Sequence, residues 1–147
     1  MKKSLTAAIA GLVLMAGPAL AGETPAPAGA KVYFINLKDG DTVKGPVKVV
    51  FGLSGMGVAP AGTDKAGTGH HHILIDRPVL GKGEDGADEF DANIPADENH
   101  KHFGKGQTET TLELAPGKHT LQLVVGDKDH IPHNPPITSG QITITVQ

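Results

Sequence analysis

Apolar and polar residues alternate with a period of two along most of the chain after residue 30. The stretch "HTLQLVVGD" (119–127) places Leu121, Leu123 and Val125 on one side, and "GQITITVQ" (140–147) repeats the pattern with Ile and Val. Such alternation is typical of β-strands that are buried on one face. Because no long apolar stripe with helical spacing appears, the pattern predicts an all-β domain.

Six segments carry this pattern and are separated by turn residues such as Asp39-Gly40. They cover residues 31–37, 46–55, 70–76, 108–114, 119–127 and 140–147. Six or seven short strands with one inward face each must cover one another, which favours an immunoglobulin-like antiparallel β-sandwich of about seven strands. The alternation predicts a core made of Val49, Phe51, Leu53, Ile73, Ile75, Leu112, Leu121, Leu123, Val125, Ile142 and Ile144.

The first 21 residues, "MKKSLTAAIAGLVLMAGPALA", are typical of a secretory signal peptide. Two lysines precede a short apolar run, and Ala19-Leu20-Ala21 supplies the small residues of a cleavage site. We therefore expect a mature chain that starts near Gly22, is periplasmic or secreted, and has no stable membrane anchor. Residues 22–30, rich in Pro, Ala and Gly, predict a flexible leader, and residues 31–147 are expected to form the single sandwich domain.

Charge and cysteine content narrow the classes of partner. Removing Lys2 and Lys3 from the 13 Lys and Arg residues leaves 11 against 16 Asp and Glu, a net charge of −5 with neutral His. This acidic balance argues against nucleic acid as a partner. The absence of cysteine excludes disulfides and thiolate metal sites, so the available metal ligands are imidazole, carboxylate and the thioether of Met56.

Seven of the eight histidines fall in three clusters, of which the first is the triplet in "TGHHHILID" (68–76). Strand alternation turns His71 toward the core, while His70 and His72 share the opposite face about 6.5–7 Å apart. One metal ion can bridge two imidazoles at that spacing. The second cluster, "HKH" (100–102), repeats the same spacing.

The expected topology brings the later clusters to the same rim of the sandwich as the triplet. A return strand at 100–103 and the long loop "GDKDHIPHNPPITSG" (126–140) both meet that rim. We predict that some three or four of five histidines bind one transition-metal ion, copper or zinc; the five are His70, His72, His102, His130 and His133. Whether Met56, His71 or His100 joins them stays open.

Structural interpretations compete with this one. His71 fits a buried imidazole hydrogen-bonded to backbone, His100 fits a solvated residue beside Asp97, and His130 and His133 fit braces of a proline-rich loop. The acidic stretch 83–99 lacks the spacing of a calcium loop. We interpret this stretch as a solvated excursion between strands, laid over Leu74 and Val124 on the outer sheet face.

Longer motifs connect the chain with known domains. "LAPGKHTLQLVVGD" (114–127) is similar to a corner connection of bacterial immunoglobulin-like domains that usually carries tyrosine where this chain has His119, which implies a structural role for His119. Together with "GMGVAPAGT", "IPADENHKHFGKGQTET" and "HIPHNPP", the chain from about Ala30 to Val146 resembles a family of small secreted bacterial proteins, domain of unknown function 4399. The resemblance implies a secreted all-β domain and assigns no activity.

Two functional hypotheses from different classes fit these residues. The first is a periplasmic or secreted protein that stores, buffers or delivers a transition metal, held by imidazoles that suit copper or zinc. The second is a non-catalytic interaction module that contacts a cell-envelope protein or a glycan through the same rim, where a periplasmic protein is the possible partner. Neither Ser54 nor Ser139 has the surroundings of a catalytic nucleophile, and no glycine-rich phosphate loop precedes a helix, so no enzyme is expected.

Overall fold

Among residues 22–147, the regular secondary structure is almost entirely short strands. The computed structural model describes residues 22–147, and the predicted signal peptide, residues 1–21, lies outside the described residues. The elements in chain order are β1 (Lys31–Phe34), β2 (Thr42–Val43), β3 (Val47–Ser54), β4 (Gly57–Val58), β5 (Thr68–Ile75), the 3-10 helix η1 (Gly86–Phe90), β6 (His100–His102), β7 (Glu109–Leu112), β8 (Gly117–Gly126) and β9 (Ile142–Val146). Within residues 22–147, no helix has the length and apolar character needed to cross a membrane.

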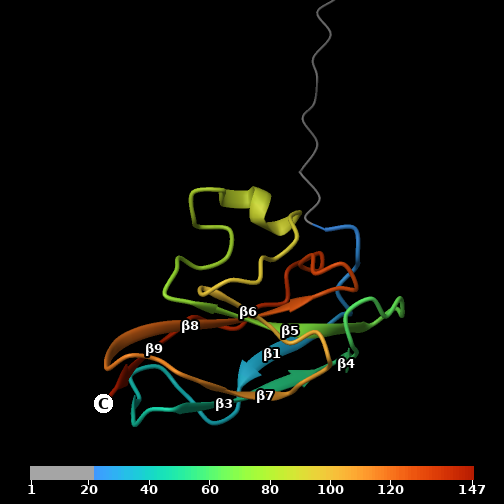
Figure 1. Cartoon of the computed structure of the whole chain (residues 1–147). Helices are drawn as coiled ribbons and strands as arrows, with labels where there is room; N and C mark the ends of the chain where they lie inside the picture. The colour runs from blue at the N-terminus through green and yellow to red at the C-terminus, as the bar shows by residue number, and fades with distance from the viewer. Residues whose placement is uncertain (1–21) are drawn as a thin grey trace, which may run out of the picture.

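The strands form two sheets that lie face to face (Figure 1). One sheet has the order β1-β3-β7, and the larger has the order β2-β9-β8-β5-β4, with β6 also paired to β5. The pairs are antiparallel except for β2 with β9 and β4 with β5, which are parallel. This arrangement confirms the predicted all-β sandwich, to which the structure adds the two-residue strands β2 and β4.

The main core fills the space between the two sheets. It contains the predicted core residues except Leu53 and Ile142, which are partly buried and pack against it. Both exceptions lie near the end of a strand, where the facing sheet no longer covers them completely. Met56 also packs against this core rather than projecting freely from its loop.

A second apolar cluster covers the outer face of the larger sheet. Leu74 of β5 and Val124 of β8 are buried there against Leu80 and Ile94, with Phe90 at the margin. These last three residues belong to the segment between β5 and β6, residues 76–99, which carries η1 and lies above the sheet in Figure 1. We call this whole segment the excursion. The excursion therefore covers Leu74 and Val124, as the acidic stretch was predicted to do, and β5 is buried on both faces.

The segment before β1 makes more specific contacts than a flexible leader would. The Thr24 hydroxyl donates to Asp127 Oδ2 at 2.6 Å. The Ala26 amide donates to the Asn134 carbonyl at 2.8 Å, and the Asn134 amide donates to the Thr24 carbonyl at 2.9 Å. In place of the leader expected for residues 22–30, the structure has a segment hydrogen-bonded to the loop after β8, because its polar backbone finds partners there.

Replacing Leu123 by alanine is expected to lower the free energy of unfolding by about 2–5 kcal/mol. The Leu123 side chain is fully buried at the centre of β8 and touches the core between the sheets. Denaturant unfolding followed by circular dichroism measures the change. Exposed Lys118 of the same strand serves as control, since its replacement by alanine should change stability by less than about 0.5 kcal/mol; equal losses in the two variants would contradict this packing.

Candidate metal centre

Strand pairing and one loop bring four histidines together. His70 and His72 project from the same face of β5, two residues apart. The register of β6 places His102 directly opposite His72. On the other side of β5, Gly126 at the end of β8 lies opposite His70, and the loop that follows carries His130.

The four imidazoles face one another closely. One ring nitrogen from each of His70, His72, His102 and His130 lies within 4.8 Å of the others. Nε2 of His70 is 3.0 Å from Nε2 of His72 and 3.1 Å from Nδ1 of His130. The His102 ring is 4.5 Å from that of His130, measured between centroids. The nitrogens therefore surround a common point.

These spacings suit a small metal ion. Zinc–nitrogen bonds of about 2.0–2.1 Å in a tetrahedron place the ligand nitrogens about 3.3–3.4 Å apart. The contacts of 3.0 and 3.1 Å are slightly shorter than this edge, and the span of 4.8 Å is longer. A tetrahedral ion would require the longest separation between these nitrogens to shorten by about 1.4 Å.

Burial keeps the inner imidazoles neutral at ordinary pH. Burial, followed by the neighbouring histidines, lowers the pKa of His70 to about 4 and that of His72 to about 2. The pKa of His102 is also lowered, first by burial and then by His130. A metal ion needs the free lone pair of a neutral imidazole, so these rings are in the form that binds.

The grouped rings leave polar atoms without partners. Nδ1 of His70, Nδ1 of His72 and Nε2 of His102 are buried and make no hydrogen bond. Buried polar groups in proteins are usually satisfied, and each exception calls for an explanation. A metal held by the facing Nε2 atoms of His70 and His72 would leave their Nδ1 atoms unpartnered, so the convergence of the four rings, and not these atoms, is what favours a metal.

Two glycines make room for the imidazoles. A Cβ atom at Gly126 would lie 2.8 Å from Nε2 of His72, and one at Gly104 would collide with the His102 ring. Any side chain at either position would force the neighbouring ring to move. Sequence alternation did not identify these glycines, since their role depends on strand register and on a turn that only the three-dimensional structure shows.

The fifth predicted ligand, His133, is not part of this group. It is fully buried, and its Nδ1 faces the Val125 carbonyl at 3.4 Å. The loop places His130 among the other rings because its backbone turns there, with a positive φ of 67°. The structure thus brings together His70, His72, His102 and His130. His133 instead faces the backbone of β8 at Val125.

His71 points into the main core, as strand alternation predicts. Its ring packs against Phe51 with 5.0 Å between centroids. Neither ring nitrogen has a well-formed hydrogen bond, and the Gln107 backbone is the polar group that acts on the ring. Burial lowers the pKa of His71 to about 4, against a smaller raising effect of the nearby Gln107 backbone. His71 is therefore a neutral core residue on the opposite side of β5 from the four grouped histidines.

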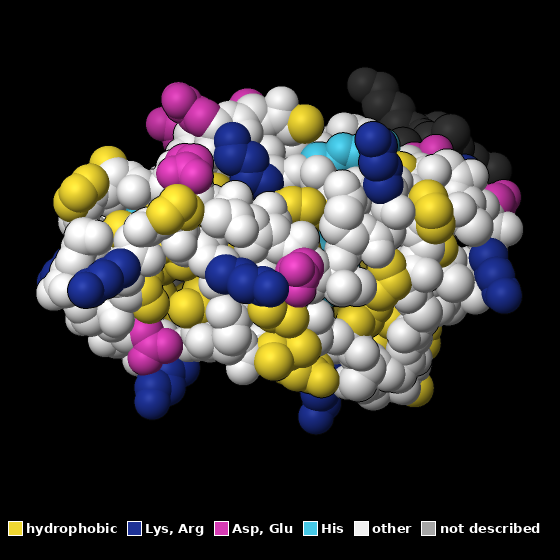
Figure 2. Space-filling model, turned by 60° about the horizontal axis from the view of Figure 1, so that its bottom comes forward, with side chains coloured by type: hydrophobic (Ala, Val, Ile, Leu, Met, Phe, Trp, Pro, Cys, Tyr) yellow, Lys and Arg dark blue, Asp and Glu magenta, His cyan; other side chains and the backbone are white. Residues whose placement is uncertain are grey.

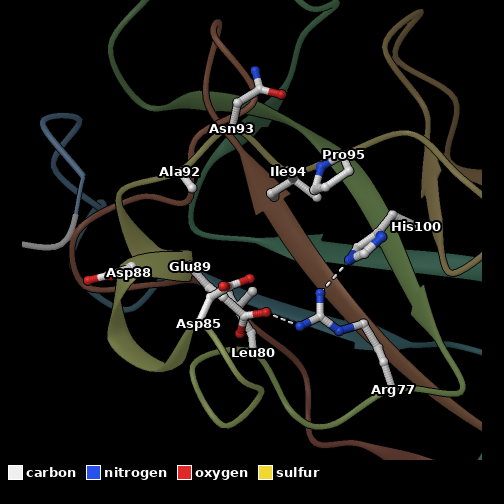
Figure 3. Close-up of a pocket in the computed structure, with 10 residues that line it drawn as sticks. All are labelled: Arg77, Leu80, Asp85, Asp88, Glu89, Ala92, Asn93, Ile94, Pro95 and His100. Carbon is white, nitrogen blue, oxygen red and sulfur yellow. Dashed lines mark hydrogen bonds and ion pairs between the residues drawn. The ribbon is translucent and has the colours of Figure 1, made fainter.

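His100 lies in a separate pocket of about 300 Å³ beneath the excursion (Figure 3). Its Nδ1 is 2.8 Å from Asp97 Oδ1, and its Nε2 contacts Arg77, which also pairs with Glu89. The remaining lining includes Leu80 and Ile94. Because Arg77 links His100 to Glu89, the pocket anchors the excursion rather than forming part of the metal site.

His119 occupies the corner position predicted for it. Its Nδ1 lies 2.7 Å from Asp76 Oδ2 and its Nε2 lies 2.8 Å from the Ala115 carbonyl. Burial acts to lower the pKa of His119, but the hydrogen bonds to Asp76 and Ala115 and the Asp76 charge outweigh it, so the pKa is raised. The imidazole therefore links β5 to the turn before β8.

Replacing His119 by alanine should lower the free energy of unfolding by about 1–3 kcal/mol, because two hydrogen bonds are lost. A raised pKa means that protonated His119 stabilises the fold. This contribution to stability is fully present below the ordinary pKa of 6.5 and disappears as pH rises through the raised value. Unfolding measured at pH 6 and pH 9 should therefore show the larger loss at pH 6. A loss that is the same at both values would exclude the ion pair with Asp76.

The site is mostly covered. His70 and His72 are buried, whereas His102 and His130 are partly exposed. Figure 2 shows histidine over only a small area of the face it presents. A metal ion would reach the site past the two outer rings.

A family model described as a domain of unknown function (DUF4399) matches residues 49–147. The match confirms the resemblance drawn from the sequence motifs and includes all four grouped histidines. No curated protein and no solved structure matches the chain.

Proposed function

Because this chain belongs to the DUF4399 family of domains of unknown function, we propose its function from the site alone: it binds one copper or zinc ion through His70, His72, His102 and His130. The observation that supports this most is the convergence of one ring nitrogen from each residue within 4.8 Å. These residues come from two strands and a loop, so local sequence spacing does not explain their meeting.

The ligand set favours copper or zinc over other metals. Four imidazoles offer borderline nitrogen donors that suit Cu(II) and Zn(II), whereas Mg(II) and Ca(II) prefer oxygen. No Asp or Glu belongs to the group of four, and the chain has no cysteine. The neutral inner rings can bind at ordinary pH without first losing a proton.

We propose that the protein stores, buffers or delivers the metal outside the cytoplasm and is not an enzyme. Four protein ligands complete a tetrahedral site, whereas catalytic zinc sites keep one position for water or substrate. The partly exposed His102 and His130 are the ligands that a periplasmic partner would reach when it takes the ion. The typical signal peptide at residues 1–21 supports this location.

Element analysis tests the proposal on protein secreted without an affinity tag. We expect about one copper or zinc ion per chain, and calorimetry on the metal-free protein should show one tight site. If neither metal is found and neither binds more tightly than free histidine, metal binding is wrong and the interaction module is the function to test.

A further inference from the structure

The loop that carries His130 is held at both ends by the segment before β1. At its start, Asp127 accepts the Thr24 hydroxyl at 2.6 Å. At its end, Asn134 exchanges two backbone hydrogen bonds with the segment, at 2.8 Å to the Ala26 amide and 2.9 Å to the Thr24 carbonyl. We call residues 22–26 the strap.

Asp127 connects the strap to the interior of the loop. Its Oδ1 accepts the Asp129 amide at 2.9 Å and the Ile131 amide at 3.0 Å, while its Oδ2 accepts Thr24. The Asp127 backbone carbonyl accepts the His130 amide at 3.0 Å. Asp127 is buried, with 5% of its surface exposed, so its orientation depends on these partners.

His130 needs this support because its backbone is in an unfavourable conformation. Its φ of 67° lies in the left-handed region, which favours glycine. Such a conformation persists when the surroundings determine it. Asp127 accepts the His130 amide, and on the other side of the residue the His130 carbonyl accepts the Ile94 amide of the excursion at 2.9 Å.

Gly22 brings the strap close to the same loop. A Cβ atom at Gly22 would collide with the Pro132 carbonyl oxygen, and its φ of 58° is also left-handed. Its amide donates to Asp91 Oδ1 at 2.5 Å, which joins the strap to the excursion. The strap therefore contacts both segments that hold the His130 backbone.

We propose that the strap positions His130 for metal binding, with Thr24 and Asp127 as positioning residues. This inference rests on the proposed metal site and adds a part of the chain that supplies no ligand itself. Thr24 completes the hydrogen bonds of Asp127, Asp127 holds the loop from 127 to 131, and the loop presents the His130 ring to His70 at 3.1 Å. Residues that orient metal ligands typically change metal affinity by about 10-fold to 100-fold when replaced.

The test replaces Thr24 by valine, which removes the hydroxyl and keeps the shape, and by serine, which restores the hydroxyl. With Zn(II) and Cu(II) as probes, we expect Thr24→Val to weaken binding at least about 10-fold and Thr24→Ser to bind within about 3-fold of wild type. In a His130→Ala background, Thr24→Val should have no further effect on affinity. Wild-type affinity in Thr24→Val, or an equal loss with and without His130, would overturn the inference.

Hydrogen exchange of the metal-free protein gives a second readout. Thr24→Val should speed exchange of the His130 and Ile131 amides, which depend on Asp127, and leave that of Leu123 in β8 unchanged. Unchanged exchange at His130 and Ile131 would refute the positioning role even if wild type binds no metal. Faster exchange combined with no metal binding by wild type would overturn the proposed function and this inference for metal, and leave the strap a purely structural support.

Discussion

Replacing both His70 and His72 by alanine should abolish tight Cu(II) and Zn(II) binding. Structural zinc sites with four ligands bind with about 10–16 kcal/mol, so an even share is about 3 kcal/mol for each ligand. Loss of two ligands therefore lowers affinity on the order of 10⁴-fold. His70 and His72 are the two buried members of the group, so water replaces them poorly. Competition with a chromophoric chelator measures the change.

Histidines outside the group provide the matched controls. His100→Ala and His133→Ala each remove one imidazole while leaving the four grouped rings in place. We expect both variants to bind within about 3-fold of wild type, whereas a single His102→Ala or His130→Ala substitution should cost on the order of 100-fold. If His133→Ala loses as much affinity as His130→Ala, the ligand set differs from the one proposed.

Strand periodicity accounts for the part of the site that could be predicted from sequence. Alternation places His70 and His72 on one face of β5 and His71 on the other whatever the neighbouring strands are. The excursion over Leu74 and Val124 was also predictable, because two apolar residues on an outer face need a cover. The first inference depends only on residues close together in the chain, and the second depends on the apolar pattern of each strand taken separately.

Loop conformation explains why the choice between His130 and His133 could not be predicted. The two residues are three positions apart in one proline-rich loop, and the left-handed turn at His130 decides which ring meets β5. That turn is held by contacts with distant segments, including Ile94 and, through Asp127, Thr24. Thr24 and Asp127 are 103 residues apart, and no local pattern encodes their contact.

The role of the segment before β1 could not be predicted either, because its partners are far away in the sequence. Its Pro, Ala and Gly content is typical of a flexible leader when the composition alone is considered. In the folded chain its backbone pairs with Asn134 and its one threonine pairs with Asp127. Composition predicts how a segment behaves without partners, and here partners are present.

The metal-free protein should lose most of its stability between pH 6.5 and pH 4. Burial, the largest cause, lowers the pKa of His70 and His71 to about 4 and that of His72 to about 2, from 6.5. As pH falls below 6.5, these histidines take up protons in the unfolded chain but not in the folded chain. Their contribution to stability is therefore present above pH 6.5 and is lost toward pH 4. Each group contributes about 1.4 kcal/mol per pH unit.

Over about two pH units these groups together lower the free energy of unfolding by several kcal/mol, a large part of the stability of an ordinary domain. Urea unfolding with a metal chelator at pH 7, 6, 5 and 4.5 measures the loss. Saturating zinc at pH 6 should restore stability, because the ion binds the folded chain more tightly than the unfolded chain. A chelated protein that is equally stable at pH 7 and pH 4.5 would show that the three imidazoles are hydrated in the folded state.

His71→Leu separates the core imidazole from the four grouped rings. His71 packs on Phe51 and neither of its nitrogens has a partner, so an apolar side chain of similar size should raise stability at pH 7 by about 1–3 kcal/mol. The variant also loses one of the three titrating groups, so the slope of stability against pH should fall by about one third. Metal affinity at pH 7 should stay within about 3-fold of wild type, because His71 lies on the opposite side of β5 from the metal site. If His71→Leu destabilises the fold at pH 7, the imidazole makes hydrogen bonds in the core. If the slope of stability against pH is unchanged, the share assigned to His71 belongs to the grouped histidines instead.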